Sequence, residues 1–596
     1  MKNSKLLGQL ALAVAVAVMA ACAGHDEIKS DRRASSVDTV TADEERDVPV
    51  AGQRPAPATE QSLKDLLATT PMPGDNDKAR IAGFRREHMS YEANGMAIAE
   101  QTRCCPLAPT EAINRENYAA YDDNPVKLAS EHPVSTFSID VDTGSYSNVR
   151  RFLTAGQLPP QDAVRVEELI NYFSYDYATP DSLDIPFNVV TELAQTPWNA
   201  DTMLLHVGLK GFEVSERDRK PSNLVFLVDV SGSMRSPDKL PLLKNALKTL
   251  TRHLDERDSV AIAGYAGGAG LILEPTNGAD GQRIIDSLDR LTAAGRTNGA
   301  AGIHLAYELA QRAYIDGGIN RVILATDGDF NVGTVNFEAL VDLVKEKRKA
   351  GVALTALGFG TGNYNDKLLE QIADAGNGNY AYIDNQREAR KVLVEEMTAT
   401  LQTIAKDVKI QIEFNPAAVA EYRLIGYENR MLRREDFNND QIDAGEIGAG
   451  HTVTALYEIT PVGSPAQLND PLRYGPQIDK SHSISAELAL VRLRYKQPDA
   501  EHSQLIERPV TRKQLGRMNR DFRFAAAVSA FGQRLRGGEY LNGFELDEIA
   551  AFADDARGRD RKGYREEFVA MVEQARMLTE SLAQTRGEGH PYHVAN

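Results

Sequence analysis

The stretch that decides the fold is LVFLVDVSGS, residues 224–233, in which five apolar residues run directly into an Asp-x-Ser-x-Ser motif. A continuous apolar run that ends in small polar residues is typical of a strand buried on both faces of a sheet. Residues two apart beyond the end of such a strand can turn their oxygens toward one point, and Gly232 lets the backbone bend there. The stretch therefore predicts a buried strand followed by an oxygen-rich cluster of Asp229, Ser231 and Ser233.

Two more pieces of the chain carry residues of the same chemical kind. Thr297 lies in a Gly-Arg-Thr-Asn loop that opens a predicted helix, and Asp327 directly follows the apolar run at 322–325. Carboxylate and hydroxyl oxygens are hard ligands that suit Mg²⁺ or Mn²⁺. Because few of them are charged, the ion would stay electrophilic and keep a position for an external carboxylate.

Each of these motifs also has a purely structural interpretation. An isolated Asp-x-Ser-x-Ser motif is more often a helix N-cap with a turn, and an isolated Thr-Asp-Gly is usually a turn. The order along the chain favours a metal site: a strand, the serine motif, a loop with Thr297, a second strand and then Asp327.

Apolar runs alternate with amphipathic stretches across the whole segment from residue 223 to residue 404. This alternation favours an α/β fold with a doubly wound, Rossmann-like sheet and helices on both faces. Open sheets of this type bind ligands at the carboxyl ends of their strands. Strands are expected at 224–230, 260–265, 271–274, 322–325, 353–359 and 380–383, and helices at 240–254, 282–291, 300–314, 337–350, 366–375 and 387–404.

These motifs resemble those of a von Willebrand factor type A (VWA) domain, placed here at residues 222–404. The wider chain is similar to the YfbK-like bacterial lipoproteins from about Tyr118 to about Leu582, through stretches such as FSIDVDT at 137–143 and REDFNND at 434–440. The resemblance implies a metal-ion-dependent adhesion site (MIDAS) that binds a protein partner. Its implied ligands are Asp229, Ser231, Ser233, Thr297 and Asp327.

The N-terminus predicts export from the cytoplasm. Lys2 and Lys5 precede an apolar stretch too short for a secure membrane span, and small residues lead to Cys22. This pattern resembles a bacterial lipobox, with residues 1–21 as the signal peptide and Cys22 as the lipid-modified residue. An ordinary secretory signal with an incidental cysteine is the alternative. Ala23 after the cysteine resembles the sorting pattern for the outer membrane of a Gram-negative cell, with the protein facing the periplasm.

The remaining chain divides into four regions. Residues 22–115 have the composition of a disordered tether, and residues 116–215 form an α+β region. Residues 405–510 are β-rich and expected to form a sandwich, and residues 511–585 are helical. The strands expected at 187–193 and 203–207 are predicted to join the sandwich, which would make the central domain an insertion.

The net charge limits the class of partner, and the few cysteines limit the possible disulfides. The formal charge of −18 argues against a nucleic-acid partner, whose phosphates would be repelled.

Besides Cys22 the chain has only the adjacent Cys104 and Cys105. In an oxidising compartment they could form a vicinal disulfide or an intermolecular cross-link; the default expectation is a tail position without a catalytic part.

A second candidate ion site lies at Asp436, Asn438 and Asp440, which have the offsets of the first ligands of a calcium loop. Gln441 stands where such a loop needs glycine, and Ile447 stands where it needs glutamate. A polar hairpin loop is therefore preferred to a Ca²⁺ site.

An enzyme has little support in this sequence. It contains no Gly-x-Ser-x-Gly elbow, no His-Glu-x-x-His and no phosphate-binding Gly-x-x-x-x-Gly-Lys motif. The preferred hypothesis is a lipid-anchored envelope protein, not an enzyme, that binds an acidic side chain of a protein partner through Mg²⁺ or Mn²⁺. The alternatives are an envelope scaffold in which the metal only stabilises loops, and a hydrolase with an unrecognised constellation.

Overall fold

The computed structural model describes residues 116–215, 217–295, 299–328, 337–396, 399, 401–470 and 487–587. The residues named above that lie outside these ranges are Lys2, Lys5, Cys22, Ala23, Cys104, Cys105 and Thr297. Within them, no helix combines the length and the apolar composition that crossing a membrane requires.

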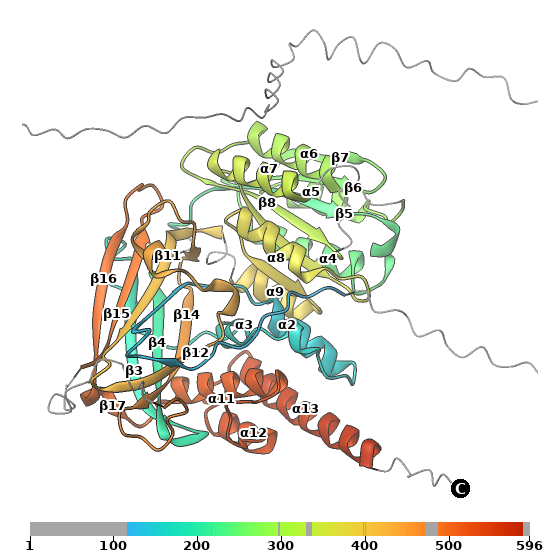
Figure 1. The fold of residues 1–596 in the computed structure, drawn as a ribbon. Helices are drawn as coiled ribbons and strands as arrows, with labels where there is room; N and C mark the ends of the chain where they lie inside the picture. Colours follow the sequence, from blue (N-terminus) through green and yellow to red (C-terminus); the bar gives the residue numbers. More distant parts are fainter. Residues whose placement is uncertain are drawn as a thin grey trace, which may run out of the picture. The chain divides into compact units, whose positions relative to one another are not determined.

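The central domain is built on a six-stranded sheet in the order β10-β9-β8-β5-β6-β7 (Figure 1). Neighbouring strands are parallel except for β7, which pairs antiparallel with β6 as a hairpin. This confirms the predicted doubly wound α/β sheet. The strands are β5 (Ser222–Asp229), β6 (Ser259–Tyr265), β7 (Ala269–Asn277), β8 (Ile319–Thr326), β9 (Ala353–Phe359) and β10 (Tyr380–Ile383).

Helices cover both faces of this sheet because alternate residues of the buried strands point to opposite sides. Leu224, Phe226 and Val228 of β5 pack with α4, α5 and α9, whereas Val225 and Leu227 pack with α6, α7 and α8. The helices are α4 (Leu240–Thr251), α5 (Gly281–Asp289), α6 (Gly299–Arg312), α7 (Phe337–Lys349), α8 (Asp366–Ala375) and α9 (Gln386–Arg390).

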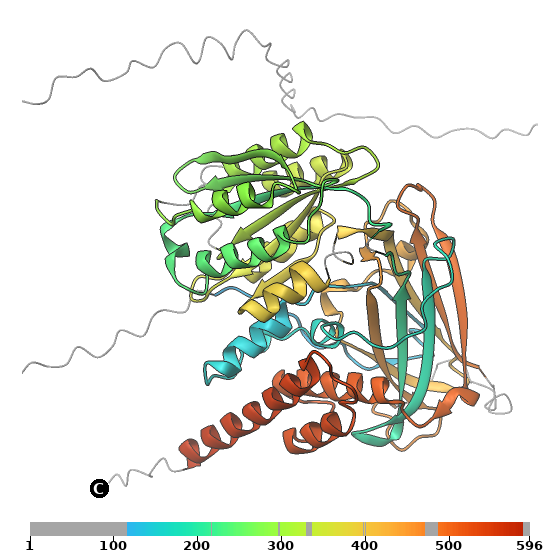
Figure 2. The ribbon, with the colours of Figure 1, turned by 180° about the vertical axis from the view of Figure 1, so that it is seen from behind.

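Two further sheets share one hydrophobic core and form a β-sandwich (Figures 1 and 2). The first has the order β1-β12-β14-β4-β3-β17, and the second has the order β13-β11-β15-β16 with β2 also paired to β11. The first sheet contains β1 (Lys127–Leu128), β3 (Phe187–Thr196), β4 (Asn199–Gly211), β12 (Val419–Ile425), β14 (Thr452–Pro461) and β17 (Leu515–Gly516). The second contains β2 (Val134–Ser138), β11 (Thr403–Phe414), β13 (Gly445–Gly448), β15 (Glu487–Lys496) and β16 (Gln504–Thr511).

The central domain is an insertion into this sandwich, as the strand pattern predicts. Strand β4, which precedes the central domain, pairs antiparallel with β14, which follows it, with Val207 opposite Ala455. The chain thus leaves the sandwich after Gly211 and returns to it at Thr403.

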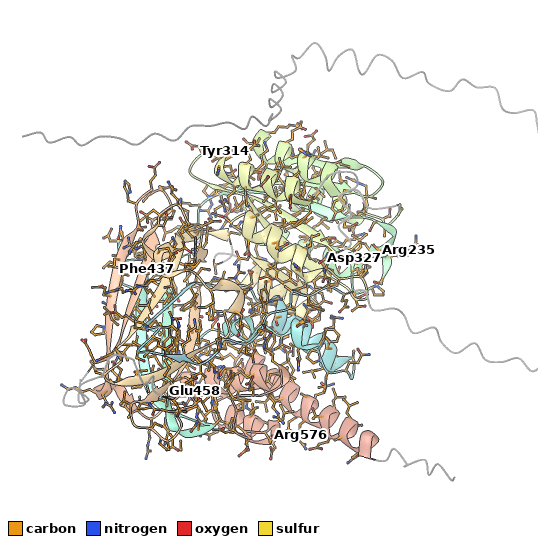
Figure 3. All side chains as sticks on the ribbon, in the orientation of Figure 1. Arg235, Tyr314, Asp327, Phe437, Glu458 and Arg576 are labelled. Atoms are coloured by element: carbon orange, nitrogen blue, oxygen red, sulfur yellow. The ribbon has the colours of Figure 1, made fainter. Side chains whose placement is uncertain are left out.

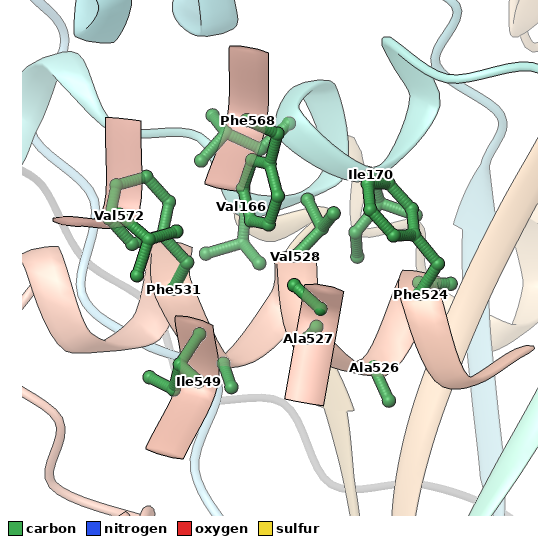
Figure 4. Close-up of a cluster of buried hydrophobic side chains, with 14 of the residues drawn as sticks. Val166, Ile170, Phe524, Ala526, Ala527, Val528, Phe531, Ile549, Phe568 and Val572 are labelled. Atoms are coloured by element: carbon green, nitrogen blue, oxygen red, sulfur yellow. The ribbon is translucent and has the colours of Figure 1, made fainter. Parts of the chain in front are cut away.

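A helical layer completes the fold. Helices α11 (Arg520–Leu535), α12 (Leu546–Asp555) and α13 (Tyr564–Gly587) pack with α2 (Gly144–Thr154) and α3 (Val166–Asn171) around one apolar cluster. In Figure 4 the aromatic rings of Phe524, Phe531 and Phe568 lie among Val166 and Ile170 of α3. The apolar stripe of α11 is therefore core.

Ion pairs, most of them between buried groups, join the flanking regions to the central domain. The Arg430 guanidinium lies 2.6 Å from Asp374 and 3.4 Å from Glu370 of α8, and 3.0 Å from Asp140 and 3.3 Å from Asp142 in the loop after β2. Two more buried arginines repeat this arrangement: Arg165 with Asp366, and Arg150 with Asp384 and Glu388.

The structure corrects the helix predicted at 387–404. Helix α9 ends at Arg390 and continues as one π-helical turn, Lys391–Glu395; residues 399 and 401 are helical, and Ile404 already lies in β11 within the sandwich core. The predicted helix therefore ends too late, because a run of apolar residues does not distinguish the end of a helix from the start of a buried strand.

Candidate metal site at the carboxyl edge of the central sheet

The two aspartates of the predicted site follow two adjacent parallel strands. Val228 pairs with Ala325, so Asp229 at the end of β5 and Asp327 just after β8 lie at the same edge of the sheet. The next α-helix after β5 is α4 on one face, and the next described α-helix after β8 is α7 on the other. Strand order reverses at this point, which is where open α/β sheets form a ligand crevice.

The first loop is organised around the Asp229 carboxylate, which is fully buried. Its Oδ1 accepts a hydrogen bond from the backbone N–H of Ser231 at 2.8 Å, and its Oδ2 accepts one from the hydroxyl of Thr326 at 3.1 Å. The Oγ atoms of Ser231 and Ser233 lie 2.9 Å apart, and Ser233 is exposed. The loop thus places two adjacent hydroxyls beside a buried carboxylate at the surface.

The second aspartate is held by a lysine that the sequence analysis did not single out. The Nζ atom of Lys239 donates to Asp327 Oδ2 at 2.9 Å and to Asn363 Oδ1 at 3.2 Å. The Asn363 amide also donates to Asp327 Oδ2, at 3.4 Å. The carboxylate is fully buried and the lysine side chain is only 8% exposed. Figure 3 labels Asp327 within the central domain.

The loop that carries Thr297 is described only at its two ends. The backbone N–H of Ala294 donates to Val230 O at 2.7 Å, and the N–H of Gly232 donates to Gly295 O at 3.1 Å. The chain is described again from Gly299, the first residue of α6. The described part of this loop therefore lies directly against the serine motif, while the role of Thr297 stays a prediction.

The electrostatics of the metal-free site favour a cation. Burial raises the pKa of Asp229 to about 6, and the nearby charge of Asp327 acts in the same direction, against hydrogen bonds from Ser231 and Thr326 that lower it. A divalent ion would relieve this cost by stabilising the ionised form.

The donor set fits a hard ion with open positions. The residues brought together here offer two carboxylates and two serine hydroxyls, with no sulfur or imidazole ligand among these described donors. Nowhere in the described ranges do three or more His, Cys, Asp or Glu residues form a group suited to a metal. Oxygen donors of this kind suit Mg²⁺ or Mn²⁺.

The structure gives the second candidate ion site a different explanation. Asp436 accepts hydrogen bonds from Arg433, Asn438 accepts one from Arg494 at 2.9 Å, and Asp440 accepts one from Ser503 at 2.5 Å. Each side chain thus serves a different partner, and two of those partners are cations. The segment is a hydrogen-bonded polar loop around a short 3₁₀ helix, Arg434–Asn438, and the Ca²⁺ hypothesis gains no support.

The loop behind the metal site also contacts Glu116 and Asn117, the first residues that the structure describes. The Glu116 carboxylate accepts from the backbone N–H of Gly362 at 2.9 Å, and Asn117 forms a parallel bridge with Asn365. Asn363, which contacts Asp327, lies between these two points. The contacts of Glu116 and Asn117 have no signal in the sequence, because they join residues more than two hundred positions apart.

Comparison with known proteins matches the chain over most of its length. The von Willebrand factor type A domain family matches residues 223–396, the family described as "Uncharacterized protein YfbK, C-terminal" matches residues 399–578, and a family described as "von Willebrand factor" matches residues 112–206. Domains of the first family mediate protein–protein interactions and commonly bind a divalent metal.

Several individual proteins are similar to this chain. The protein YfbK of Escherichia coli (strain K12) is 49% identical over 471 residues, which cover 78% of this chain and 81% of that protein. The protein sll0103 of Synechocystis is 29% identical over 178 residues, covering 30% of this chain and 41% of that protein. A solved structure of a von Willebrand factor type A protein from Catenulispora acidiphila is 17% identical, covers 66% of this chain and 91% of its own, and has a TM-score of 0.37.

None of these names states an enzymatic activity, and the matches to the von Willebrand factor type A family and to YfbK support a protein-interaction or assembly role. The identity to YfbK extends well beyond the central domain into the sandwich and helical regions that surround it. The chain belongs to the YfbK family of von Willebrand factor type A domain proteins.

Proposed function

We propose that this protein is a lipid-anchored component of the bacterial cell envelope that captures a protein partner through a divalent ion. The ion, Mg²⁺ or Mn²⁺, is held by Asp229, Ser231 and Ser233 from the first loop, Thr297 from the second and Asp327 from the third. An aspartate or glutamate of the partner completes the coordination shell. The anchor is a lipid on Cys22 that holds the protein at the outer membrane, facing the periplasm.

The observation that carries the proposal is the pair of serine hydroxyls set 2.9 Å apart beside the buried Asp229 carboxylate, at the point where strand order reverses. The two hydroxyls contribute no charge, so the two aspartates are the only ligands of this set that neutralise the ion. Mg²⁺ normally retains some water ligands, and a carboxylate can replace one of them. The exposure of Ser233 leaves this side of the site accessible.

The scaffold alternative, in which the ion only stabilises loops, has less support. The first loop is held by hydrogen bonds from Ser231 and Thr326, and Asp327 by Lys239 and Asn363, with no ion involved. Loops supported in this way do not need an ion as a structural element.

Pull-down from detergent-solubilised envelopes tests the proposal. The bait is the protein with Mn²⁺, the same protein with a chelator, and the Asp229→Asn variant with Mn²⁺. Asp289→Asn is a matched control, because Asp289 is an exposed aspartate of the same domain, paired with Lys248. We expect the same partner to be captured by the wild type and the control, and to be lost with chelator or with Asp229→Asn. Capture that survives both treatments would refute the metal-mediated mechanism.

The anchor is tested separately. Cys22→Ser is expected to move the protein from the membrane fraction to the soluble periplasmic fraction, because no lipid can then be attached. A Cys104→Ser variant is the control and should remain in the membrane fraction. Retention of Cys22→Ser in the membrane fraction would contradict the lipid anchor without affecting the metal site.

A further inference from the structure

Lys239 occupies an unusual position for a cation, beside a site that is proposed to bind another cation. It stands at the N-terminal boundary of α4, where its backbone carbonyl accepts from Leu243 N at 2.9 Å. Its side chain then runs inward rather than into solvent and ends on Asp327 Oδ2 at 2.9 Å. Lysine is rarely buried unless it is paired, so this geometry requires its partner.

The neighbouring loop leaves space for this side chain. Gly360 has a φ of +75°, and a Cβ atom there would overlap the Cγ, Cδ and Cε atoms of Lys239. The end of the side chain is fixed by Asn363, which accepts from Nζ through its Oδ1. The lysine is therefore positioned by two different parts of the loop between β9 and α8.

The charges at the site show what this cation does. Asp229 and Asp327 are both fully buried and close enough to influence each other electrostatically. Two buried carboxylates without a counter-charge are costly, and one ammonium offsets part of that cost. When a divalent ion joins two carboxylates and one ammonium, the site keeps a net positive charge.

We propose that Lys239 is a built-in counter-cation of the metal site. Without metal it holds Asp327 in place through its hydrogen bond to Oδ2. With metal it opposes tight retention of the ion and leaves the occupied site electropositive, which favours a carboxylate ligand. This inference rests on the proposed metal-binding function and adds a residue that tunes the strength of ion and ligand binding.

The test compares Lys239→Met and Lys239→Gln with the wild type. Methionine removes the charge and every donor, whereas glutamine removes the charge but keeps a donor for Asp327, so it covers the case in which the methionine variant does not fold. Lys244→Met is the matched control. It removes a lysine of the same helix that bonds to the backbone carbonyls of Asp289 and Leu291, away from the metal site.

The first measurement is the Kd for Mn²⁺, by calorimetry on the full folded chain. Both Lys239 variants are expected to bind Mn²⁺ at least tenfold more tightly than the wild type, because a nearby positive charge no longer repels the ion. The second is Tm in chelator and in Mn²⁺. We expect chelator to lower the Tm of the Lys239 variants far more than that of the wild type or the Lys244→Met control.

The third measurement probes the ligand position with acetate. Acetate is titrated into the Mn²⁺-loaded proteins, and displacement of metal-bound water is followed by water-proton relaxation. The wild type is expected to exchange water for acetate at severalfold lower acetate concentration than the Lys239 variants.

The outcomes separate the two proposals. If the Lys239 variants bind Mn²⁺ no more tightly than the wild type, the counter-cation is refuted while the metal site stands. If neither wild type nor variants bind Mn²⁺, the proposed function itself falls, and the inference with it. Equal acetate titrations in wild type and variants would refute the electropositive role.

Discussion

Replacing Asp229 by asparagine is expected to stabilise the metal-free protein while it abolishes binding of the divalent ion. Burial and the nearby Asp327 hold the pKa of Asp229 at about 6, against an ordinary value of 3.8. At pH 7.5 the ionised carboxylate therefore costs the folded state about 3 kcal/mol, at about 1.4 kcal/mol per pKa unit. Asparagine carries no charge and avoids this cost.

Part of this gain is offset by weaker hydrogen bonds. The Oδ1 of an asparagine can still accept from Ser231 N, but its amide group must donate to the Thr326 hydroxyl instead of accepting from it. Replacing a charged acceptor in this way costs about 1 kcal/mol. The expected net gain is about 1–2 kcal/mol, equivalent to a Tm increase of about 2–8 °C for a unit of 150–250 residues.

The assay is thermal unfolding of wild type and Asp229→Asn in chelator at a series of pH values, repeated with Mn²⁺ at pH 7.5. Because the folded pKa of Asp229 lies above its unfolded value, protonation stabilises the wild type as the pH falls from about 6 toward 3.8. The advantage of the variant should therefore be largest above pH 6 and should disappear near pH 4. Mn²⁺ should raise the Tm of the wild type only.

The matched control is again Asp289→Asn, which removes an exposed carboxylate of the same domain. Its Tm should follow that of the wild type in Mn²⁺. The reasoning is refuted if Asp229→Asn is less stable than the wild type in chelator at pH 7.5, or if the difference between them does not shrink on acidification.

Two other predictions concern the flanking regions. In a urea titration, Arg430→Met should lower the free energy of unfolding by about 3–5 kcal/mol, because it leaves Asp140 and the other buried carboxylates around it without a cation. Arg576→Met, which removes an exposed ion pair on a helix, should lower it far less in the same titration. Comparable losses in the two variants would contradict the network's role. The His206 imidazole is hydrogen-bonded to Tyr177, and burial lowers its pKa from 6.5 to about 4. His206 is therefore protonated less readily in the folded chain than in the unfolded chain. The free energy of unfolding should therefore fall by up to about 3 kcal/mol between pH 6.5 and pH 4. His206→Gln should remove this loss of stability. A pH profile that is the same in the variant would show that His206 does not cause the loss.

Most of the central domain could be predicted from sequence because its elements have strong local signals. The limits expected for β9, β10 and α8 match those observed, since each is a short apolar or amphipathic run bounded by glycine or polar residues. Strand β16 was missed. It is an exposed strand that carries charges and Pro509, so neither alternation nor a continuous apolar run marks it.

Local chemistry alone was enough to predict the buried strand at 224–228, the oxygen donors that follow it and the insertion of the central domain into the sandwich, which the pairing of β4 with β14 then showed. Only the folded structure decided which groups surround those donors. Lys239 and Asp327 are 88 positions apart, and Arg430 lies 290 positions from Asp140. Pairs of residues this far apart produce no periodic pattern in the sequence. They form because a buried ionised group destabilises the fold unless an opposite charge lies next to it. Whether such a charge lies there depends on how the sheet edges and helix ends pack.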